Sequence, residues 1–477
     1  MKQPHWIANQ AQFSETEFQV CNPADTRDVV GIITLGDAAL VDQAVQSAKR
    51  AQPAWAAASL ETRIAALLTF ADHLSAETET LTALLMREQG MLRSVVSREV
   101  QEAVKQVREL CRVAPAELES LTLEASDGQA RVVKIPYGIV GAIVPWNAPI
   151  SLATAKLIPA LLAGNAMIMK PAPRAPLGIS RFIELVMRCV PAGLIHLIHG
   201  TEAVGQALVT HPEIRKIAFT GSTAVGRAVM RAASDTLKSV QCELGGNDAA
   251  VVLPGTDMTP HVDALATSAF RRSGQFCYAT KRIYVHRADA DQLISQLKTW
   301  MAAQWVGPPS DPQATIGPVI DRAQQARLTQ LIEDTKASGV TIEAYGHWCD
   351  SAEQEYGCYV RPHLATDIPG DHPLVLEEQF GPLLPVVVYD DLERVFDEVN
   401  RTEYGLSGSL WGDDLSTLQR LATRIEAARV FLNSPRPLGS ISDQMPAGGL
   451  KQSGLGWEKS VYGIREYYQY QSINWCA

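Results

Sequence analysis

The chain has 477 residues, which is too long for one simple hydrophobic core and predicts two or three domains. Hydrophobic residues make up 46% and charged residues 20%, as in a folded globular protein. Because the formal net charge is −10 and Lys and Arg form no dense run, a nucleic-acid-binding surface is disfavoured.

Targeting and metal-binding patterns are weak. No apolar stretch reaches the roughly 18 residues that suggest a membrane helix, and residues 1–10 lack the pattern of a secretory signal. The eight cysteines form no C-x-x-C pair and no Cys/His ligand set. We therefore expect no metal site, no membrane partner and a reducing cytoplasmic location.

The first quarter of the chain is predicted to be mainly helical. Apolar residues at helical spacing over 37–57 predict an amphipathic helix that Asp37 could cap. Helical periodicity continues through 62–110 with few breakers. A short β-like run at 131–135 is expected to pair in a hairpin with the residues before it.

Strands and helices then alternate. Apolar runs predict strands over 138–144, 166–170, 194–198, 215–219 and 239–244, with helices over 151–163, from Pro176 onward, over 202–209 and over 223–233. Such alternation implies an α/β fold with a Rossmann-like parallel sheet covered by helices on both faces. Sheets of this kind bind ligands at the carboxyl ends of their strands.

A second α/β region is expected from about residue 257. Its strands are predicted over 282–285 and 385–389, and its helices over 289–304 and 321–338. Both helices open with an aspartate, Asp289 or Asp321, which is a favoured capping residue. The segment 433–456 is rich in Gly, Pro and Ser, so we expect a long loop, and loops of this length are often functional.

Two glycine-rich turns lie in the first α/β region. Residues 200–205 (GTEAVG) and 221–226 (GSTAVG) each follow a predicted strand and open a helix, where backbone amides and the helix dipole can hold a phosphate. Neither is an ATP-binding P-loop and neither has G-x-G-x-x-G spacing, so each is also compatible with a plain turn. Lys170 ends a strand of the same sheet, either near a ligand or at the surface.

Two further residues are candidates for chemistry. Glu243 ends the strand over 239–244 on the face opposite Cys242, where it could act as a general base if partly desolvated or could simply be solvated. Cys277 lies in a predicted loop or helix start. A thiol at a helix N-terminus can become a nucleophile, although most cysteines are inert.

Taken together, these segments resemble the aldehyde dehydrogenase superfamily, specifically its non-acylating, NAD(P)-dependent members. The resemblance spans about 22–467, and the family's order and the Glu243-to-Cys277 separation are both kept. The matching motifs are PWNAP (145–149), FTGS (219–222), ELGG (243–246), GQFC (274–277), EEQFGP (377–382) and GLKQSG (449–454).

The resemblance implies a covalent mechanism. Cys277 would attack the aldehyde carbon, and the Asn147 amide and the Cys277 backbone N–H would hold the oxyanion. After hydride transfer to the nicotinamide, water activated by Glu243 would hydrolyse the thioester. Because relatives that transfer the acyl group to coenzyme A usually lack this glutamate, we expect a free carboxylic acid as product.

The resemblance also implies the cofactor contacts, with Lys170 at the adenosine ribose, Gly221 and Ser222 near the pyrophosphate, Glu378 at the nicotinamide ribose and Phe380 near the nicotinamide. The full expected set is Ile143, Pro145, Trp146, Lys170, Gly200, Gly205, Phe219, Gly221, Ser222, Val225, Gly226, Leu244, Glu378 and Phe380.

One departure bears on the choice between NAD and NADP. Pro173 stands where NAD-preferring relatives often have a glutamate for the ribose hydroxyls, and the adjacent Arg174 could accommodate a 2′-phosphate. We expect NAD, with NADP as the alternative.

The substrate is less constrained. Ala148 and Leu152 lie where many relatives have larger side chains, and Phe276 and Tyr278 would supply apolar walls, which favours a bulky apolar or aromatic aldehyde. Arg436 could anchor the carboxylate of a semialdehyde, or it could be a solvated loop residue. A cofactor-independent cysteine esterase or acyltransferase stays open, and so does a non-catalytic scaffold, although no catalytic group is missing.

The family's organisation implies two domains, an oligomerisation element through which a homodimer or homotetramer forms, and a loop at the substrate channel. The expected division is 1–119 and 137–244 for the NAD(P)-binding domain, 245–435 for the catalytic domain, 120–136 and 460–477 for the oligomerisation hairpin and C-terminal strand, and 436–459 for the loop bordering the substrate channel.

Overall fold

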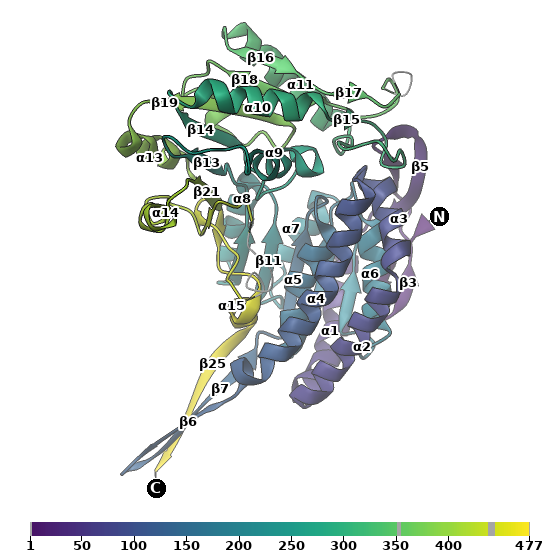
Figure 1. The fold of residues 1–477 in the computed structure, drawn as a ribbon. Coiled ribbons are helices and arrows are strands. Elements are labelled where there is room, and N and C mark those ends of the chain that lie inside the picture. Colours follow the sequence, from purple (N-terminus) through teal and green to yellow (C-terminus); the bar gives the residue numbers. More distant parts are fainter. Residues whose placement is uncertain (1, 351–353, 437–443, 477) are drawn as a thin grey trace.

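The computed structural model describes residues 2–350, 354–436 and 444–476. Two large sheets, one of eight strands and one of seven, organise these residues, and a three-stranded sheet projects from the body (Figure 1). The central strands of both large sheets pair in parallel and alternate with helices along the chain, so the predicted α/β fold class is confirmed. No helix in the described ranges has both the length and the apolar character that crossing a bilayer requires.

The N-terminal part forms a small sheet and a layer of helices. The sheet contains β1 (Lys2–Gln3), β4 (Glu17–Asn22) and β5 (Asp25–Thr34), and the helices are α1 (Ala38–Ala57), α2 (Leu60–Ala76), α3 (Thr78–Gln89) and α4 (Arg93–Leu118). Asp37 caps α1 by accepting from the Leu40 N–H at 3.0 Å, as predicted. The periodic stretch over 62–110 is three helices, because α2 ends before Glu77, whose backbone is not helical, and left-handed Gly90 ends α3.

Five parallel strands form the centre of the eight-stranded sheet, which confirms the predicted alternation. These are β8 (Ile139–Val144), β9 (Ala166–Pro171), β10 (Ile195–Leu197), β11 (Lys216–Thr220) and β12 (Ser239–Glu243), joined through α5 (Pro149–Leu162), α6 (Leu177–Met187), α7 (Glu202–Thr210) and α8 (Thr223–Ser234). Three antiparallel edge strands were not predicted, namely β2 (His5–Ile7), β3 (Gln10–Gln12) and β24 (Gly454–Leu455).

The seven-stranded sheet forms the second α/β region. Its strands are β13 (Ala249–Val252), β14 (Arg282–His286), β16 (Thr341–Ala344), β18 (His363–Thr366), β19 (Leu383–Tyr389), β21 (Ser407–Trp411) and β22 (Arg429–Leu432). Its helices are α9 (Val262–Phe270), α10 (Ala290–Ala302), α11 (Arg322–Ala337), α12 (Pro373–Leu376), α13 (Leu392–Asn400) and α14 (Leu415–Ala422), with the short pair β15 (Trp305–Val306) and β17 (His347–Trp348) beside them.

One of the two predicted aspartate caps in this region is wrong. Asp321 caps α11 by accepting from the Gln324 N–H at 2.7 Å. Asp289 precedes α10 but makes no capping bond to it, because its carboxylate accepts from the Gly255 N–H at 2.8 Å.

The segment predicted as one long loop contains two short strands. β23 (Leu450–Lys451) pairs with β20 (Tyr404–Gly405), and β24 pairs antiparallel with β12, so that Gly454 lies opposite Glu243. Residues 437–443 of this loop lie outside the described residues. The segment thus adds a strand to the edge of the first sheet at the point where Glu243 ends its strand.

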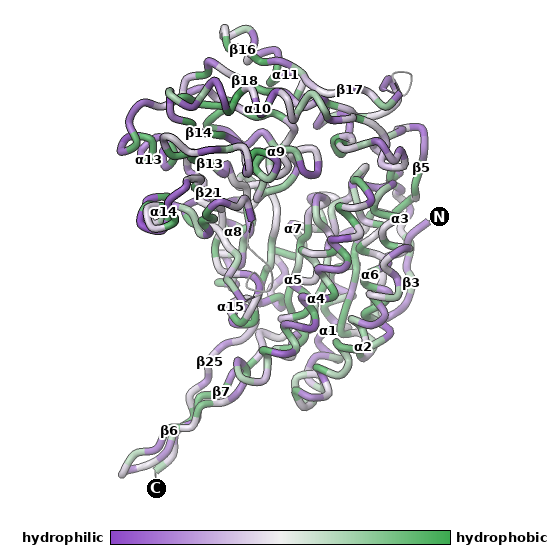
Figure 2. Tube along the Cα trace, in the orientation of Figure 1, coloured by the Kyte–Doolittle hydropathy of each residue, from purple (hydrophilic) through white to green (hydrophobic). Residues whose placement is uncertain are grey.

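The projecting sheet joins the chain's C-terminal strand to the predicted hairpin. β25 (Tyr468–Cys476), which follows α15 (Ser460–Arg465), pairs with β7 (Gly128–Pro136), and β7 pairs with β6 (Leu121–Ala125) (Figure 1, lower left). Hydrophobic residues gather in the body, around α5 and α6 (Figure 2), yet this arm also exposes large apolar side chains. They are Leu121, Leu123, Tyr470, Ile473 and Trp475.

Candidate active site

Glu243 is a buried carboxylate at the end of β12. The residue is only 6% exposed, and its Oε1 has no hydrogen-bond partner among the described residues. Burial raises the pKa of the Glu243 carboxyl well above its ordinary value, and the negative charge of Glu458 raises it further. A buried carboxyl group with a raised pKa is suited to proton transfer.

A buried ion pair that the sequence analysis missed lies near Glu243. Lys156 on α5 pairs with Glu458, and the two side chains are 0% and 5% exposed. The Lys156 ammonium opposes the rise in the Glu243 pKa. A signal for it was present in the sequence, since Lys156 is the one charged residue of an otherwise apolar helix, and such a lysine needs a buried partner.

Cys277 lies in a turn, so of the two predicted alternatives the loop holds and the helix start does not. A single 3₁₀ turn over Arg271–Gly274 precedes it, in which Arg272, Ser273 and Gly274 all have positive φ. A side chain at Gly274 would collide with the Gly381 carbonyl, so glycine is what allows this close approach. Without a helix dipole, burial dominates and raises the pKa of the Cys277 thiol to about 12.

Asn147 lies over the loop that carries Cys277. Its side-chain amide donates to the Gln275 carbonyl at 3.3 Å, and its own carbonyl accepts from the Arg272 guanidinium. Asn147 is 5% exposed, so its amide is held between the two segments. The structure therefore brings a predicted oxyanion donor to within two residues of the candidate nucleophile.

A second missed ion pair fixes this arrangement. Arg272 pairs with Glu99 of α4 at 2.6 Å, with both side chains buried. The same Glu99 carboxylate accepts from the N–H groups of Ile150 and Ser151 in the first turn of α5, at 2.9 and 3.2 Å. One carboxylate thus links the helix that follows Asn147 to the turn that precedes Cys277.

The predicted cofactor residues line the carboxyl edge of the eight-stranded sheet. Ile143 on β8 lies opposite Lys170 on β9, and Phe219 on β11 lies beside the end of β12. Lys170 is 6% exposed, its ammonium has no ion pair in the described ranges, and burial lowers its pKa to about 8. Pro145 and Trp146 follow β8, Gly200 precedes α7, and Gly205 lies in α7 beside the Lys170 side chain.

The start of α8 is the second part of this edge. Gly221 and Ser222 connect β11 to α8, Ser222 caps the helix by accepting from the Val225 N–H at 3.4 Å, and Val225 itself is 50% exposed. Gly226 contacts Leu244 at the end of β12. An accessible helix start of this kind can hold an anionic group such as a pyrophosphate.

Glu378 and Phe380 complete the edge near the catalytic turn. Glu378 accepts from the Gly246 N–H at 3.2 Å, and a Cβ at Gly245 would lie 2.5 Å from its carboxylate, so a side chain there would displace that carboxylate. The Phe380 ring meets Trp146 edge-on at 5.7 Å. A buried cation, an accessible helix start and a carboxylate in sequence along one edge fit a dinucleotide.

Arg174, considered above as a partner for a 2′-phosphate, is already paired. Its Nε lies 2.9 Å from Asp321, the residue that caps α11. An added phosphate would therefore compete with a carboxylate for this guanidinium.

The predicted substrate residues lie at the start of α5 and in the turn that carries Cys277. Ala148 is buried and Leu152 is half-buried at the start of α5, while the rings of Phe276 and Tyr278 flank Cys277 with centroids 6.0 Å apart. The Tyr278 hydroxyl is buried and has no hydrogen-bond partner in the described part of the chain. The wall is mostly apolar and contains one buried hydroxyl.

Cations gather next to this wall. The Arg271 guanidinium lies 5.7 Å from the Phe276 ring centroid and forms no ion pair within the described residues. Burial, together with the nearby charges of Arg272, Arg98 and Arg436, lowers the Arg271 pKa to about 10. Arg436 is exposed, so this cluster opens to solvent.

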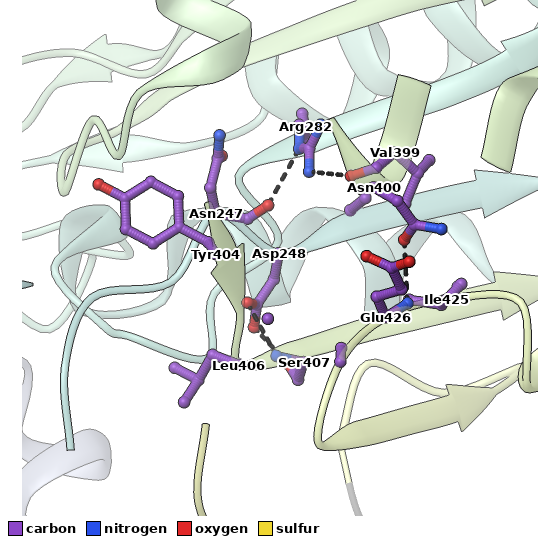
Figure 3. Close-up of a pocket in the computed structure, with 13 residues that line it drawn as sticks. Asn247, Asp248, Arg282, Val399, Asn400, Tyr404, Leu406, Ser407, Ile425 and Glu426 are labelled. Carbon is purple, nitrogen blue, oxygen red and sulfur yellow. Dashed lines mark hydrogen bonds between the residues drawn. The ribbon is translucent and has the colours of Figure 1, made fainter. Parts of the chain in front are cut away.

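A small pocket is lined by residues that follow Gly245–Gly246, and hydrogen bonds among its lining residues join neighbouring segments of the second α/β region (Figure 3). Asp248 accepts from the Ser407 N–H at 3.1 Å and from its hydroxyl, and burial raises the Asp248 pKa to about 7. Arg282 donates to the carbonyls of Asn247 and Val399 at 3.0 and 2.8 Å. In the described residues no cluster of three or more His, Cys, Asp or Glu side chains could hold a metal ion.

Comparisons with known proteins point the same way. The model of the aldehyde dehydrogenase family matches residues 6–473. A betaine aldehyde dehydrogenase of Rhizobium etli is 32% identical over 450 residues, which are 94% of this chain and 92% of the relative. A Sinorhizobium fredii protein described as a "probable succinate-semialdehyde dehydrogenase" with NADP(+) is 33% identical over 470 residues, 98% and 93% of the two chains. The crystal structure of Staphylococcus aureus betaine aldehyde dehydrogenase with NAD+ has a TM-score of 0.94 at 27% identity, covering 99% of this chain and 94% of that one.

Proposed function

Because this chain belongs to the aldehyde dehydrogenase family and is an NAD(P)-dependent aldehyde oxidoreductase, we propose that Cys277, Glu243 and Asn147 carry out its reaction. The observation that carries the proposal is the buried Glu243 carboxylate with a free Oε1. Glu243 is also one of the charged groups that act on the Cys277 thiol.

In the first half-reaction, Cys277 loses its proton to water and its sulfur adds to the aldehyde carbon. The Asn147 amide and the Cys277 backbone N–H donate to the oxygen that becomes an alkoxide. The bound nicotinamide supplies the hydride acceptor, and the acyl group then remains on Cys277 as a thioester. The apolar walls at Phe276 and Tyr278 exclude bulk water during this step.

In the second half-reaction, Glu243 takes a proton from a water molecule, whose oxygen attacks the thioester carbon. The sulfur leaves as the thiolate and a free carboxylic acid is released. The high pKa of Glu243 makes it a base strong enough for this step, while burial keeps it near the acyl group. The charged groups that act most strongly on the thiol are Lys281, Glu378, Asp248 and Glu243, and a histidine, as a cysteine hydrolase would use, is not among them.

Two variants test these roles. Cys277→Ala should abolish aldehyde-dependent NAD(P)H formation, and Cys189→Ala, at another half-buried free cysteine, should retain it. Glu243→Gln should release about one NAD(P)H per active site in a burst and then turn over slowly. Substantial turnover by folded Cys277→Ala, or a full steady-state rate in Glu243→Gln, would contradict the assignment.

For the substrate, we propose a bulky apolar or aromatic aldehyde, supported by Ala148, Leu152 and the two aromatic walls. A second candidate is an aldehyde that carries a carboxylate. The cationic cluster of Arg271, Arg98 and Arg436 favours it, as does the name of the Sinorhizobium fredii relative.

A matched pair of substrates separates the two candidates. Benzaldehyde and 4-carboxybenzaldehyde differ only in the carboxylate. If the arginines bind it, Arg271→Met should raise KM for 4-carboxybenzaldehyde about tenfold and leave benzaldehyde unchanged, since a charged hydrogen bond is worth about 1.5–3 kcal/mol. Equal effects on both substrates would remove the second candidate.

We further propose NAD as the preferred cofactor, because the Arg174 guanidinium is already paired with Asp321.

We also propose a division into a cofactor-binding part, a catalytic part and an oligomerisation arm, which the separate sheets support. The exposed apolar side chains of the arm support a homodimer or homotetramer, and eight unpaired cysteines suit a reducing cytoplasm. Sedimentation of the intact chain as a monomer alone would contradict the assembly.

A further inference from the structure

Lys281 is a buried lysine four residues after Cys277, at a position for which the sequence analysis gave no role. It is 1% exposed. Its ammonium donates to the carbonyls of Phe276, Cys277 and Ala279 at 2.6, 3.3 and 3.4 Å. The positive charge therefore lies inside the turn that carries the thiol, held by neutral acceptors.

The acidic groups around this ammonium do not neutralise it by direct hydrogen bonds. The nearest carboxylate oxygen, on Glu378, is 3.9 Å from the Lys281 Nζ, and the Asp248 carboxylate is bonded to Ser407. The Phe380 ring centroid lies 5.8 Å from the same Nζ. The charge of Lys281 thus remains available to act on the thiol.

The balance of charge around the thiol depends on this one lysine. After burial, the charged groups that act on Cys277 are Lys281, which favours a thiolate, and Glu378, Asp248 and Glu243, which disfavour it. The neighbouring Tyr278 hydroxyl is buried and neutral. Because the turn also lacks a helix N-terminus, no backbone dipole replaces the lysine.

We propose that Lys281 is a positioning residue that fixes the turn over 276–279 through its carbonyls and stabilises the Cys277 thiolate against three carboxylates. The proposal rests on Cys277 being the nucleophile, as proposed above. A thiol must ionise before it can add to an aldehyde, so the charge sets how much of the enzyme is reactive at a given pH.

The pH dependence of thiol alkylation tests the proposal without substrate or cofactor. In the intact protein, the sulfur of Cys277 displaces iodide from iodoacetamide, and mass spectrometry of its peptide gives the rate from about pH 6 to pH 10. Lys281→Gln keeps N–H donors for the turn but removes the charge, whereas Lys281→Arg keeps the charge. Lys238→Gln is the matched control, because Lys238 is also buried and donates only to carbonyls, at the opposite end of β12.

We expect Lys281→Gln to slow alkylation about tenfold at each pH in this range, because loss of the charge raises the pKa of the Cys277 thiol by about one unit and the whole range lies below that pKa. Lys281→Arg and Lys238→Gln should follow the unaltered protein. An unchanged alkylation rate in Lys281→Gln, or equal slowing in the Gln and Arg variants, would overturn the proposal. If iodoacetamide does not label Cys277 in the unaltered protein, the proposed function itself fails, which distinguishes the two failures.

Discussion

The Arg272–Glu99 pair gives the most direct test of how the site is held. Arg272→Met removes the cation but keeps much of the apolar stem, and it leaves the Glu99 carboxylate buried beside the first turn of α5. Breaking a buried ion pair by removing one partner costs about 3–5 kcal/mol. The lower figure is the more suitable here, because Ile150 and Ser151 still donate to Glu99.

The same structure gives the size of the thermal shift. The entropy of unfolding is about 2.1 cal/mol/K per residue, which gives about 1 kcal/mol/K for a chain of 477 residues. A loss of about 3–5 kcal/mol in unfolding free energy should therefore lower the midpoint of thermal unfolding by about 3–5 °C. Because Arg272 also donates to the Asn147 carbonyl, the rate of hydride transfer should fall as well. Thermal scans at one fixed rate and single-turnover NAD(P)H formation measure the two effects.

A surface pair of equal length is the matched control. Arg287 and Asp390 also approach to 2.6 Å, but their side chains are 66% and 65% exposed. Arg287→Met should change the midpoint by less than about 1 °C, since exposed pairs contribute little. If both variants lower the midpoint equally, or if Arg272→Met leaves it unchanged, burial is not what gives the inner pair its importance.

Two further predictions concern the base and the cofactor. Since the Glu243 pKa is raised, its carboxylate form is lost at a higher pH than for an ordinary glutamate. Steady-state turnover should therefore fall as the pH is lowered through that pKa, and the acyl adduct should accumulate on the Cys277 peptide. A flat pH profile with no adduct would contradict this. Asp321→Asn should raise kcat/KM for NADP relative to NAD about fivefold or more, because it frees Arg174 while Asn still caps α11; an unchanged ratio would show that Arg174 does not reach the 2′-phosphate.

The parallel sheet was predictable because its strands are short apolar runs separated by amphipathic helices. That alternation placed Lys170 and Glu243 at strand ends, and the observed register brings them to one sheet edge. The edge strand β24 was not predictable in this way, since its two residues lie in a Gly-rich segment and pair only because Gly454 meets Glu243. Short pairing of this kind depends on the partner strand, not on local propensity.

The groups that hold the catalytic side chains were also missed, for a different reason. Lys156 and Glu458 are 302 residues apart in the chain, and Arg272 and Glu99 are 173 apart. Periodicity and spacing describe neighbours along the chain, so they cannot pair such charges. The sequence does show a single charged residue in a mainly apolar helix at Lys156, which indicates that a buried partner exists but not which residue it is.

The three catalytic groups differ in the charge that lies near each. Glu243 has the Lys156–Glu458 pair, the Asn147 segment has Arg272–Glu99, and Cys277 has Lys281 among carboxylates. In a buried, weakly polarisable site each such charge acts strongly on its nearest group and is not replaced by water. The Lys156–Glu458 pair, the Arg272–Glu99 pair and Lys281 lie on different elements and share no atom, so each can be altered while the others remain. Loss of Lys281 should therefore slow formation of the first NAD(P)H, whereas loss of Lys156 should slow release of the acid, because the two charges act on groups that work in successive half-reactions.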